Sequence, residues 1–164
     1  MSNRDLILLF QDNTDDYFLF ERALRKVGIA NSIRLVRYFE EATCYLGGVG
    51  VYNDRTVYPL PALVIVDLSV LAGTGFKLLR WIRSKPRFAK LPLIALGRSR
   101  QDPWVQAAYD AGANAFFVKT LNMSELVATL EDLELIRDIL RTEPAETSDA
   151  GFIESGWQEL SSIG

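Results

Sequence analysis

The sequence contains no histidine among its 164 residues. This absence excludes every mechanism in which an imidazole of this chain takes part. Serine–histidine–aspartate hydrolases, cysteine–histidine proteases, histidine metal sites and a phosphohistidine intermediate are all ruled out. Any chemistry must therefore use carboxylates, amines, hydroxyls, the backbone or a bound metal ion.

Cysteine, long apolar runs and strong charge are also scarce. Cys44 is the single cysteine, so no internal disulfide can form. The net charge of −3 gives no sign of a nucleic-acid or membrane-surface binder. No apolar run approaches the roughly 20 residues that cross a bilayer, and the N-terminal residues lack the layout of a signal peptide. We therefore expect a cytoplasmic protein that binds neither nucleic acid nor membrane.

The sequence does contain a regular alternation of short apolar runs and helix patterns. Its length and its apolar fraction of 49% suit one domain with a substantial core. Short apolar strands separated by helices predict a parallel sheet that is covered on both faces. Strands are predicted at about 5–10, 32–36, 63–66, 93–96 and 115–118, with helices that begin after Asn13, near Phe39, near Gly75, after Asp102 and near Asn122.

The composition changes at residue 142, which divides the chain into a domain over residues 1–141 and a tail over 142–164. The tail begins with a polar linker. Beyond it, Ile153, Trp157 and Leu160 recur at helical spacing. Two interpretations of the tail remain open: a loose terminus, or a short docked helix that covers an apolar patch.

Three charged residues stand at or just after the ends of predicted strands. Asp12 follows the first strand, Asp67 ends the third and Lys119 ends the fifth. Open parallel sheets bind their ligands outside the carboxyl ends of the strands, so we expect these three side chains to converge. Two acids and one lysine at one sheet edge predict a small site for a divalent cation and a phosphoryl group.

These residues resemble the receiver domains of two-component response regulators over roughly Asp5 to Leu140. The likeness is carried by the first strand with its acidic turn, the strand and helix around Asp67, and the strand that ends at Lys119. A narrower likeness, carried by residues 18–24 and 58–62, is to single-domain receivers that partner bacterial phytochrome histidine kinases. The resemblance implies an α/β, flavodoxin-like (βα)5 sandwich of three layers, with a parallel sheet of order 2-1-3-4-5.

The resemblance also implies a role for each site residue. Asp67 would accept a phosphoryl group from the phosphohistidine of a sensor histidine kinase, and Lys119 would pair with the phosphate. Mg²⁺ would bind Asp67, Asp12 and the backbone carbonyl of Ser69. Phe116 holds the aromatic switch position, whose rotamer reports activation. The protein would not be an enzyme in the ordinary sense, because it would signal through protein–protein contacts.

The same resemblance implies where those contacts form. The fourth helix, fifth strand and fifth helix would present the output face, and a homodimer through that face is consistent with this subfamily. We therefore expect output through protein contacts rather than through a DNA-binding domain.

Four positions depart from the family pattern. Gln11 stands where the family has an acid, so we expect this position to contact the metal only weakly or through water. Gly97 stands at the switch position, where a threonine or serine normally follows the phosphoryl group. Leu71 and Thr120 each replace a proline. These departures leave open an alternative function, a degenerate receiver that binds partners without phosphorylation.

Simpler structural roles are open for the same residues. Asp67 could cap the third helix, and Lys119 could form an ion pair with Asp67 or Asp12 in place of the cation. Asp15 and Asp16 fit acids that favour the start of a helix better than they fit ligands.

Two other protein classes fit less well. Haloacid-dehalogenase-like hydrolases need a second acid where this chain has Ser69. Flavodoxin-type FMN binders need a hydroxyl-rich phosphate loop where residues 11–16 are acidic.

Overall fold

The computed structural model describes residues 6–70, 73–100 and 104–120, together with Met123, Leu130 and Ile139. The elements along the chain are β1 (Ile7–Phe10), α1 (Thr14–Lys26), β2 (Ile33–Val36), α2 (Phe39–Gly47), the 3-10 helix η2 (Gly50–Asn53), β3 (Leu63–Asp67), α3 (Thr74–Arg83), the 3-10 helix η4 (Pro86–Phe88), β4 (Leu93–Gly97), α4 (Trp104–Asp110) and β5 (Ala115–Val118). Leu71, the expected start of the fourth helix at residues 102–103, nearly all of the predicted fifth helix and the tail over 142–164 lie outside the described residues.

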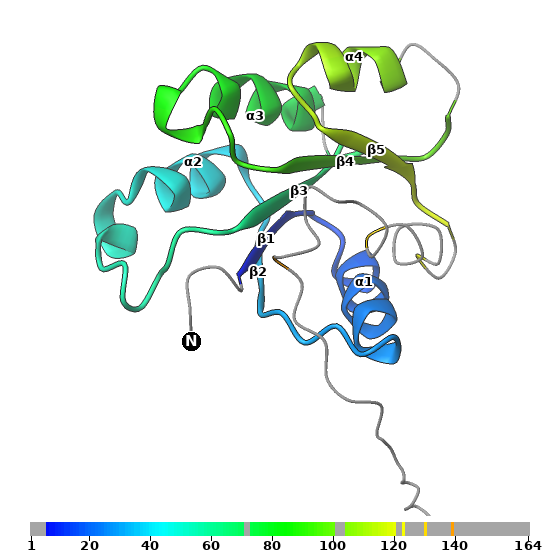
Figure 1. Cartoon of the computed structure of the whole chain (residues 1–164), viewed down its shortest axis with the longest axis horizontal. Helices are drawn as coiled ribbons and strands as arrows, with labels where there is room; N and C mark the ends of the chain where they lie inside the picture. Colours follow the sequence, from blue (N-terminus) through cyan, green and yellow to red (C-terminus); the bar gives the residue numbers. More distant parts are fainter. Residues whose placement is uncertain are drawn as a thin grey trace, which may run out of the picture.

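The five strands form one parallel sheet in the order β2-β1-β3-β4-β5 (Figure 1). Helix α1 covers one face of the sheet, and α2, α3 and α4 cover the other (Figure 1). The predicted flavodoxin-like fold class and its strand order are therefore confirmed. Within the described part of the chain, no helix combines the length and apolar character that a bilayer crossing requires.

Two hydrophobic cores lie on the two faces of the sheet, because successive side chains of a strand point in opposite directions. Leu8, Val64 and Ala95 belong to the core that contains residues of α2, α3 and α4. Leu9 and Ile65 belong to the core that contains residues of α1. Every residue of β3 is buried, so the strand that ends in Asp67 is fixed from both sides.

Helix α1 begins and ends as its sequence predicts. The side chain of Asn13 caps it by accepting a hydrogen bond from the Asp16 N–H at 3.0 Å. At the other end, Gly28 has a positive φ of 85°, and the Ile29 N–H donates to the Leu24 carbonyl at 3.0 Å. This ending is a Schellman motif, which glycine favours because it lacks a Cβ.

The carboxyl ends of β3, β4 and β5 are level with one another. Asp67 is paired with Leu96, and Gly97 is paired with Val118. Lys119 follows directly, and its N–H donates to the Gly97 carbonyl at 2.8 Å. The register therefore brings Asp67 and Lys119 to the same edge of the sheet.

Candidate functional site

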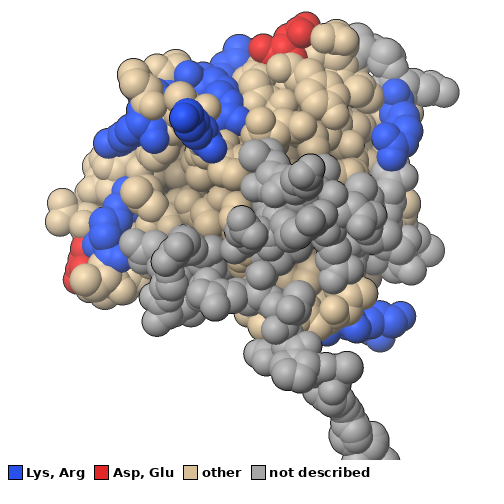
Figure 2. All heavy atoms as spheres, in the orientation of Figure 1, with Lys and Arg blue, Asp and Glu red and all other residues tan. Residues whose placement is uncertain are grey.

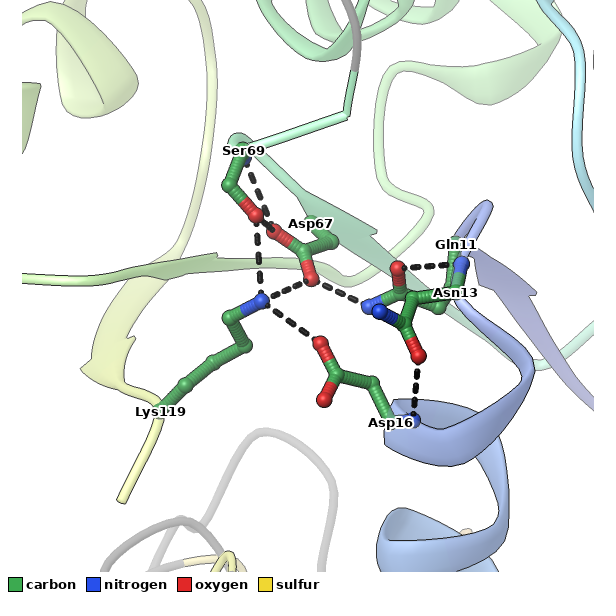
Figure 3. A network of polar contacts seen from close by, with 6 residues as sticks. All are labelled: Gln11, Asn13, Asp16, Asp67, Ser69 and Lys119. Atoms are coloured by element: carbon green, nitrogen blue, oxygen red, sulfur yellow. Dashed lines mark hydrogen bonds and ion pairs between the residues drawn. The ribbon is translucent and has the colours of Figure 1, made fainter. Parts of the chain in front are cut away.

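Asp67 lies at the centre of a polar network at this edge, and its side chain is fully buried (Figure 3). One carboxylate oxygen, Oδ1, accepts the N–H of Ser69 at 2.8 Å and the Ser69 hydroxyl at 2.6 Å. The other, Oδ2, accepts the Lys119 ammonium at 2.7 Å and the side-chain amide of Gln11. A buried carboxylate is costly unless it is paired and hydrogen-bonded, and these four donors meet that need.

The Lys119 ammonium is shared by three residues of the network (Figure 3). Besides Asp67, it contacts Asp16 Oδ2 at 2.9 Å and Ser69 Oγ at 3.0 Å, and only 11% of its side chain is exposed. Burial lowers the pKa of Lys119, but the hydrogen bonds and charges of Asp67 and Asp16 outweigh burial and leave the pKa raised. The ammonium therefore keeps its charge at neutral pH.

Asp16 is a site residue that the sequence analysis assigned only to the start of a helix. It does lie in the first turn of α1, but its carboxylate also forms an ion pair with Lys119. The expected place at the start of a helix is therefore confirmed, and the ion pair with Lys119 is an additional role. The signal was present in the sequence, because a cap at Asn13 places residue 16 in the turn that rises directly from the carboxyl end of β1.

Gln11, the first residue after β1, reaches Asp67, whereas Asp12 does not. Phe10 is paired with Val66, so the next residue, Gln11, lies beside Asp67. Gln11 is buried, with 2% of its surface exposed. Its amide donates to Asp67, so a neutral donor stands where the family has an acid.

Asp12 lies one residue further out and is exposed. Its backbone carbonyl accepts a hydrogen bond from Arg37 Nη1 at 3.4 Å, and Arg37 Nη2 donates to Thr14 Oγ1 at 3.0 Å. None of the contacts described for Asp67 comes from Asp12. The ion pair between Lys119 and Asp67 is present. The second carboxylate paired with Lys119 belongs to Asp16 and not to Asp12.

The oxygen atoms at this edge have the chemistry that Mg²⁺ prefers. They are carboxylates, a backbone carbonyl at Ser69 and an amide oxygen at Gln11. Among the described residues there is no cluster of three or more acidic, cysteine or histidine side chains placed to hold a metal ion. The Lys119 ammonium instead faces both Asp67 and Asp16. The donor types at this edge therefore fit a divalent cation.

Gly97 and Phe116, the two switch positions, are in direct contact. A Cβ built on Gly97 would lie 2.6 Å from Cζ and 2.9 Å from Cε2 of the Phe116 ring. The ring is 4% exposed, so it fills the space that a side chain at position 97 would need. Trp104 is 39% exposed and packs edge-on against Phe76 with ring centroids 5.8 Å apart. Phe116 is therefore buried and does not form an exposed face together with Trp104.

With this geometry described, the chain can be compared with known proteins. Its sequence matches the family described as the response regulator receiver domain over residues 7–131. The response regulator Rcp1 of Synechocystis sp. is 26% identical over 129 residues, which cover 79% of this chain and 86% of Rcp1. The crystal structure of the Mn²⁺-bound form of Rcp1 has a TM-score of 0.68, at 26% identity, and the match covers 86% of this chain and 99% of the other.

Two further solved structures have the same character. The response regulator RPA3017, from red light signalling of R. palustris, has a TM-score of 0.73 at 26% identity and covers 85% of this chain and 99% of its own. The phosphorylated cyanobacterial phytochrome response regulator RcpA has a TM-score of 0.70 at 26% identity and covers 84% of this chain and 99% of its own. These similarities confirm the resemblance to phytochrome-associated response regulators and favour two-component signalling over the phosphorylation-independent alternative. The chain belongs to the response regulator receiver domain family.

Proposed function

We propose that Asp67 of this receiver accepts a phosphoryl group from the phosphohistidine of a sensor histidine kinase. The observation that supports it is the buried carboxylate of Asp67, which is held at the carboxyl edge of the sheet beside a charged ammonium. In the step, an Asp67 oxygen attacks the phosphorus atom and the P–N bond breaks. The kinase imidazole leaves with the bonding electron pair, and an acyl phosphate remains on Asp67.

The contacts of the two carboxylate oxygens assign different tasks to them. Oδ1 is held by the backbone N–H and the hydroxyl of Ser69, so it orients the carboxylate. Oδ2 is held by the ends of two long side chains, Lys119 and Gln11, which can move without disturbing the strand. We therefore assign the nucleophile to Oδ2.

Lys119 balances the charge of the product. Aspartyl phosphate carries nearly two negative charges, and the Lys119 ammonium already lies 2.7 Å from the attacking oxygen. Its raised pKa keeps it charged throughout. Asp16, on the other side of the ammonium, is a positioning residue that holds Lys119 at the edge of the sheet.

Mg²⁺ is the cofactor that this donor set suits. We assign it to the carboxylates of Asp67 and Asp12 and to the backbone carbonyl of Ser69, with Gln11 as a weak or water-mediated contact. When bound, such a cation offsets the negative charge of the incoming phosphoryl group. The response regulator Rcp1 has been crystallised in a Mn²⁺-bound form, which supports a divalent cation in a relative.

The remaining assignments concern partners and extent. We assign the receiver domain to residues 1–141, which is supported by the family match over 7–131. The partner is a kinase of the phytochrome type, and the receiver forms a homodimer through α4, β5 and the fifth helix. The protein works in the cytoplasm and signals by contact rather than by turnover of a small molecule.

The test is phosphorylation of the full-length chain with acetyl phosphate and Mg²⁺, followed by intact mass spectrometry. We expect the gain of one phosphoryl group that is lost in Asp67→Ala and reduced when the cation is chelated. Asp15→Ala, which removes an exposed acid from the same turn as Asp16, is the matched control and should be phosphorylated like the wild type. No gain of mass, or an equal gain in Asp67→Ala, would overturn the assignment.

A further inference from the structure

The opposite end of the sheet carries a surface groove. A hollow of about 290 Å³ is lined by Leu60, Pro61, Arg87, Phe88, Lys90 and Leu91, and we call it the basal groove. A second hollow of about 260 Å³ shares Leu60, Arg87 and Phe88 with it and continues along the end of α2. Pro61 and Leu91 precede β3 and β4, so the groove lies at the amino ends of these strands, away from Asp67.

Two loops that are held by arginine hydrogen bonds form the walls of the basal groove. Arg55 donates to the carbonyls of Tyr45 and Leu46 at 2.8 Å and of Tyr58 at 3.1 Å, which ties the loop before β3 to the end of α2. On the other side, one nitrogen of Arg83 donates to the carbonyls of Phe88 and Leu91. The groove is therefore preformed, and an occupant would not have to order its walls.

The surface around the groove is apolar and positively charged. Val49, Val51, Val57 and Leu60, all on the segment before β3, are 57%, 73%, 56% and 39% exposed. Residues 68–101 contain eight basic residues and no acid. Figure 2 shows Lys and Arg side chains gathered at the edge of the molecule over the C-terminal end of α3.

Two of these basic residues line the groove without a carboxylate partner. Arg87 and Lys90 are exposed, and no ion pair in the described part of the chain includes either of them. Arg87 lies over the Phe88 ring, 4.8 Å from its centroid. The basal groove therefore suits an occupant that combines apolar side chains with carboxylates.

The C-terminal tail of this chain has that composition. Residues 142–164 contain five acids and no basic residue, whereas the first 141 residues hold all 18 basic residues and 16 acids. The net charge is thus −5 for the tail and +2 for the rest of the chain. Among the acids of the tail lie Phe152, Ile153, Trp157 and Leu160, which are large apolar residues of the kind that fill grooves.

The tail also leaves the domain at the correct end. Asn31 donates its side-chain amide to the backbone oxygen of Ile139 at 2.9 Å, and the Ile7 N–H at the start of β1 donates to the Ser32 carbonyl at 2.8 Å. Residue 139 is therefore at the amino end of the sheet, a few strand spacings of about 4.8 Å from β3 and β4. Residues 140–149 alone can span roughly 33–36 Å, which is enough to reach the groove.

We propose that residues 150–160 of the tail dock in the basal groove of the same molecule, with their apolar side chains in the groove and their carboxylates beside Arg87 and Lys90. This contact holds the tail away from the edge that carries Asp67. It is independent of whether Asp67 is phosphorylated.

The exposure of Trp157 tests the proposal in the full-length chain. Trp81→Phe and Trp104→Phe leave Trp157 as the only tryptophan of the three, and acrylamide quenching then reports its exposure. We expect protection in this background and its loss in Arg87→Glu/Lys90→Glu. Reversal turns two attractions into two repulsions, so the docked-to-free ratio should fall about tenfold. Added salt should weaken protection in the same direction.

Two further variants separate docking from general effects. Arg22→Glu/Lys26→Glu, at exposed positions of α1, makes the same change in net charge on the other face and should leave Trp157 protected. Glu154→Lys/Glu159→Lys reverses the charge at two positions of the tail, outside the domain assigned to residues 1–141, and should expose Trp157. Combined with Arg87→Glu/Lys90→Glu, these two tail substitutions should restore protection.

An engineered disulfide shows whether the tail contacts the basal groove of its own molecule or that of a second molecule. In a Cys44→Ser background, cysteines at Lys90 and Glu154 should form a bond under mild oxidation that appears at the monomer mass. Trp157 equally quenched in all variants would overturn the proposal. A disulfide found only at the dimer mass would also overturn it, because the occupant of the groove would then be the tail of a second copy.

Discussion

The two halves of the site at the carboxyl edge of the sheet are built differently. In one half, Lys119 after β5 contacts Asp67 at the end of β3 and Asp16 in the first turn of α1, at 2.7 Å and 2.9 Å. At the end of β4, Gly97 offers no side chain, and the Phe116 ring from β5 fills the space beside it. The first half is held by charge and hydrogen bonds, and the second by apolar packing.

This difference separates the residues to which we assign the phosphoryl group from the two switch positions. The polar half holds the Asp67 carboxylate and the Lys119 ammonium, which under our proposal accept the phosphoryl group and pair with it. The apolar half lacks the hydroxyl that would follow that group, and its aromatic ring is already buried. A hydroxyl at position 97 therefore cannot couple the phosphoryl group to the Phe116 ring in this chain.

The largest effect is expected from Lys119→Met, which removes the charge from the polar half. Asp67 would remain fully buried with Gln11 and Ser69 as its donors but without a cation. Breaking a buried ion pair from one side costs about 3–5 kcal/mol, because the remaining charge is uncompensated. Urea unfolding at pH 7 should show a loss of about 3 kcal/mol in the free energy of unfolding. Asp67→Asn/Lys119→Met is the control, and it should recover most of the loss.

The stability difference between the wild type and Lys119→Met should also depend on pH. The pKa of Lys119 is raised in the folded state, so the ammonium stabilises the fold fully below its unfolded pKa of about 10.4. That contribution is lost as the pH rises through the folded pKa. The difference in stability between wild type and Lys119→Met should therefore be constant near neutrality and shrink above pH ~10.4. A difference that shrinks on acidification alone would contradict this assignment.

The next largest effect is expected from Gly97→Thr, which disrupts the packing of the apolar half. Its Cβ would lie 2.6 Å from the Phe116 ring, so the ring must move. Overpacking of this kind costs about 1–3 kcal/mol. Because Trp104 lies 3.7 Å from the same Cβ position, its fluorescence should change as well. Unfolding by urea and the emission of Trp104 measure the two effects.

A second substitution identifies the cause. In Gly97→Thr/Phe116→Ala the ring is absent, and the threonine should no longer add a cost beyond that of Phe116→Ala alone. If the costs of the two single variants simply add, the contact between Gly97 and Phe116 is not what limits the side chain at position 97.

Much of the fold follows from local patterns in the sequence. The strands are short apolar runs, and α1 begins at a capping Asn13 and ends at a Gly28 that adopts a positive φ. The convergence of Asp67 and Lys119 also follows, since parallel strands end at one edge. These features depend on residues close together in the chain or on a general rule of sheet topology.

The details of the site depend on contacts between distant segments, which the pattern does not determine. Gln11 and Asp12 are both polar and both follow β1, and only the register with β3 places Gln11 against Asp67. The ring of Phe116 is buried because position 97, on a neighbouring strand, is a glycine. A shift of one residue in strand register would therefore bring a different side chain to Asp67, and a different rotamer of Phe116 would change the space beside position 97.

The smallest effect is expected from Gln11→Glu, which changes the polar half alone. The glutamate would replace a hydrogen-bond donor to Asp67 with a second negative charge. The Lys119 ammonium, 2.7 Å from Asp67, offsets part of the repulsion, so we expect a loss of about 1 kcal/mol without metal. The emission of Trp104, in the apolar half, should not change.

Mg²⁺ should offset the loss of stability in Gln11→Glu. A second carboxylate next to Asp67 adds a hard oxygen ligand, so Mg²⁺ should raise the melting temperature more in Gln11→Glu than in the wild type. Gln11→Met is the uncharged control. It removes the hydrogen bond to Asp67 and also the one that Gln11 Oε1 accepts from the Asn13 N–H at 3.0 Å, and it should respond to Mg²⁺ no more than the wild type does. If Gln11→Glu and Gln11→Met respond equally to the cation, position 11 does not face the metal. The divalent site would then depend on Asp12, Asp67 and Ser69 alone, and the acid missing at position 11 would not explain weak metal binding.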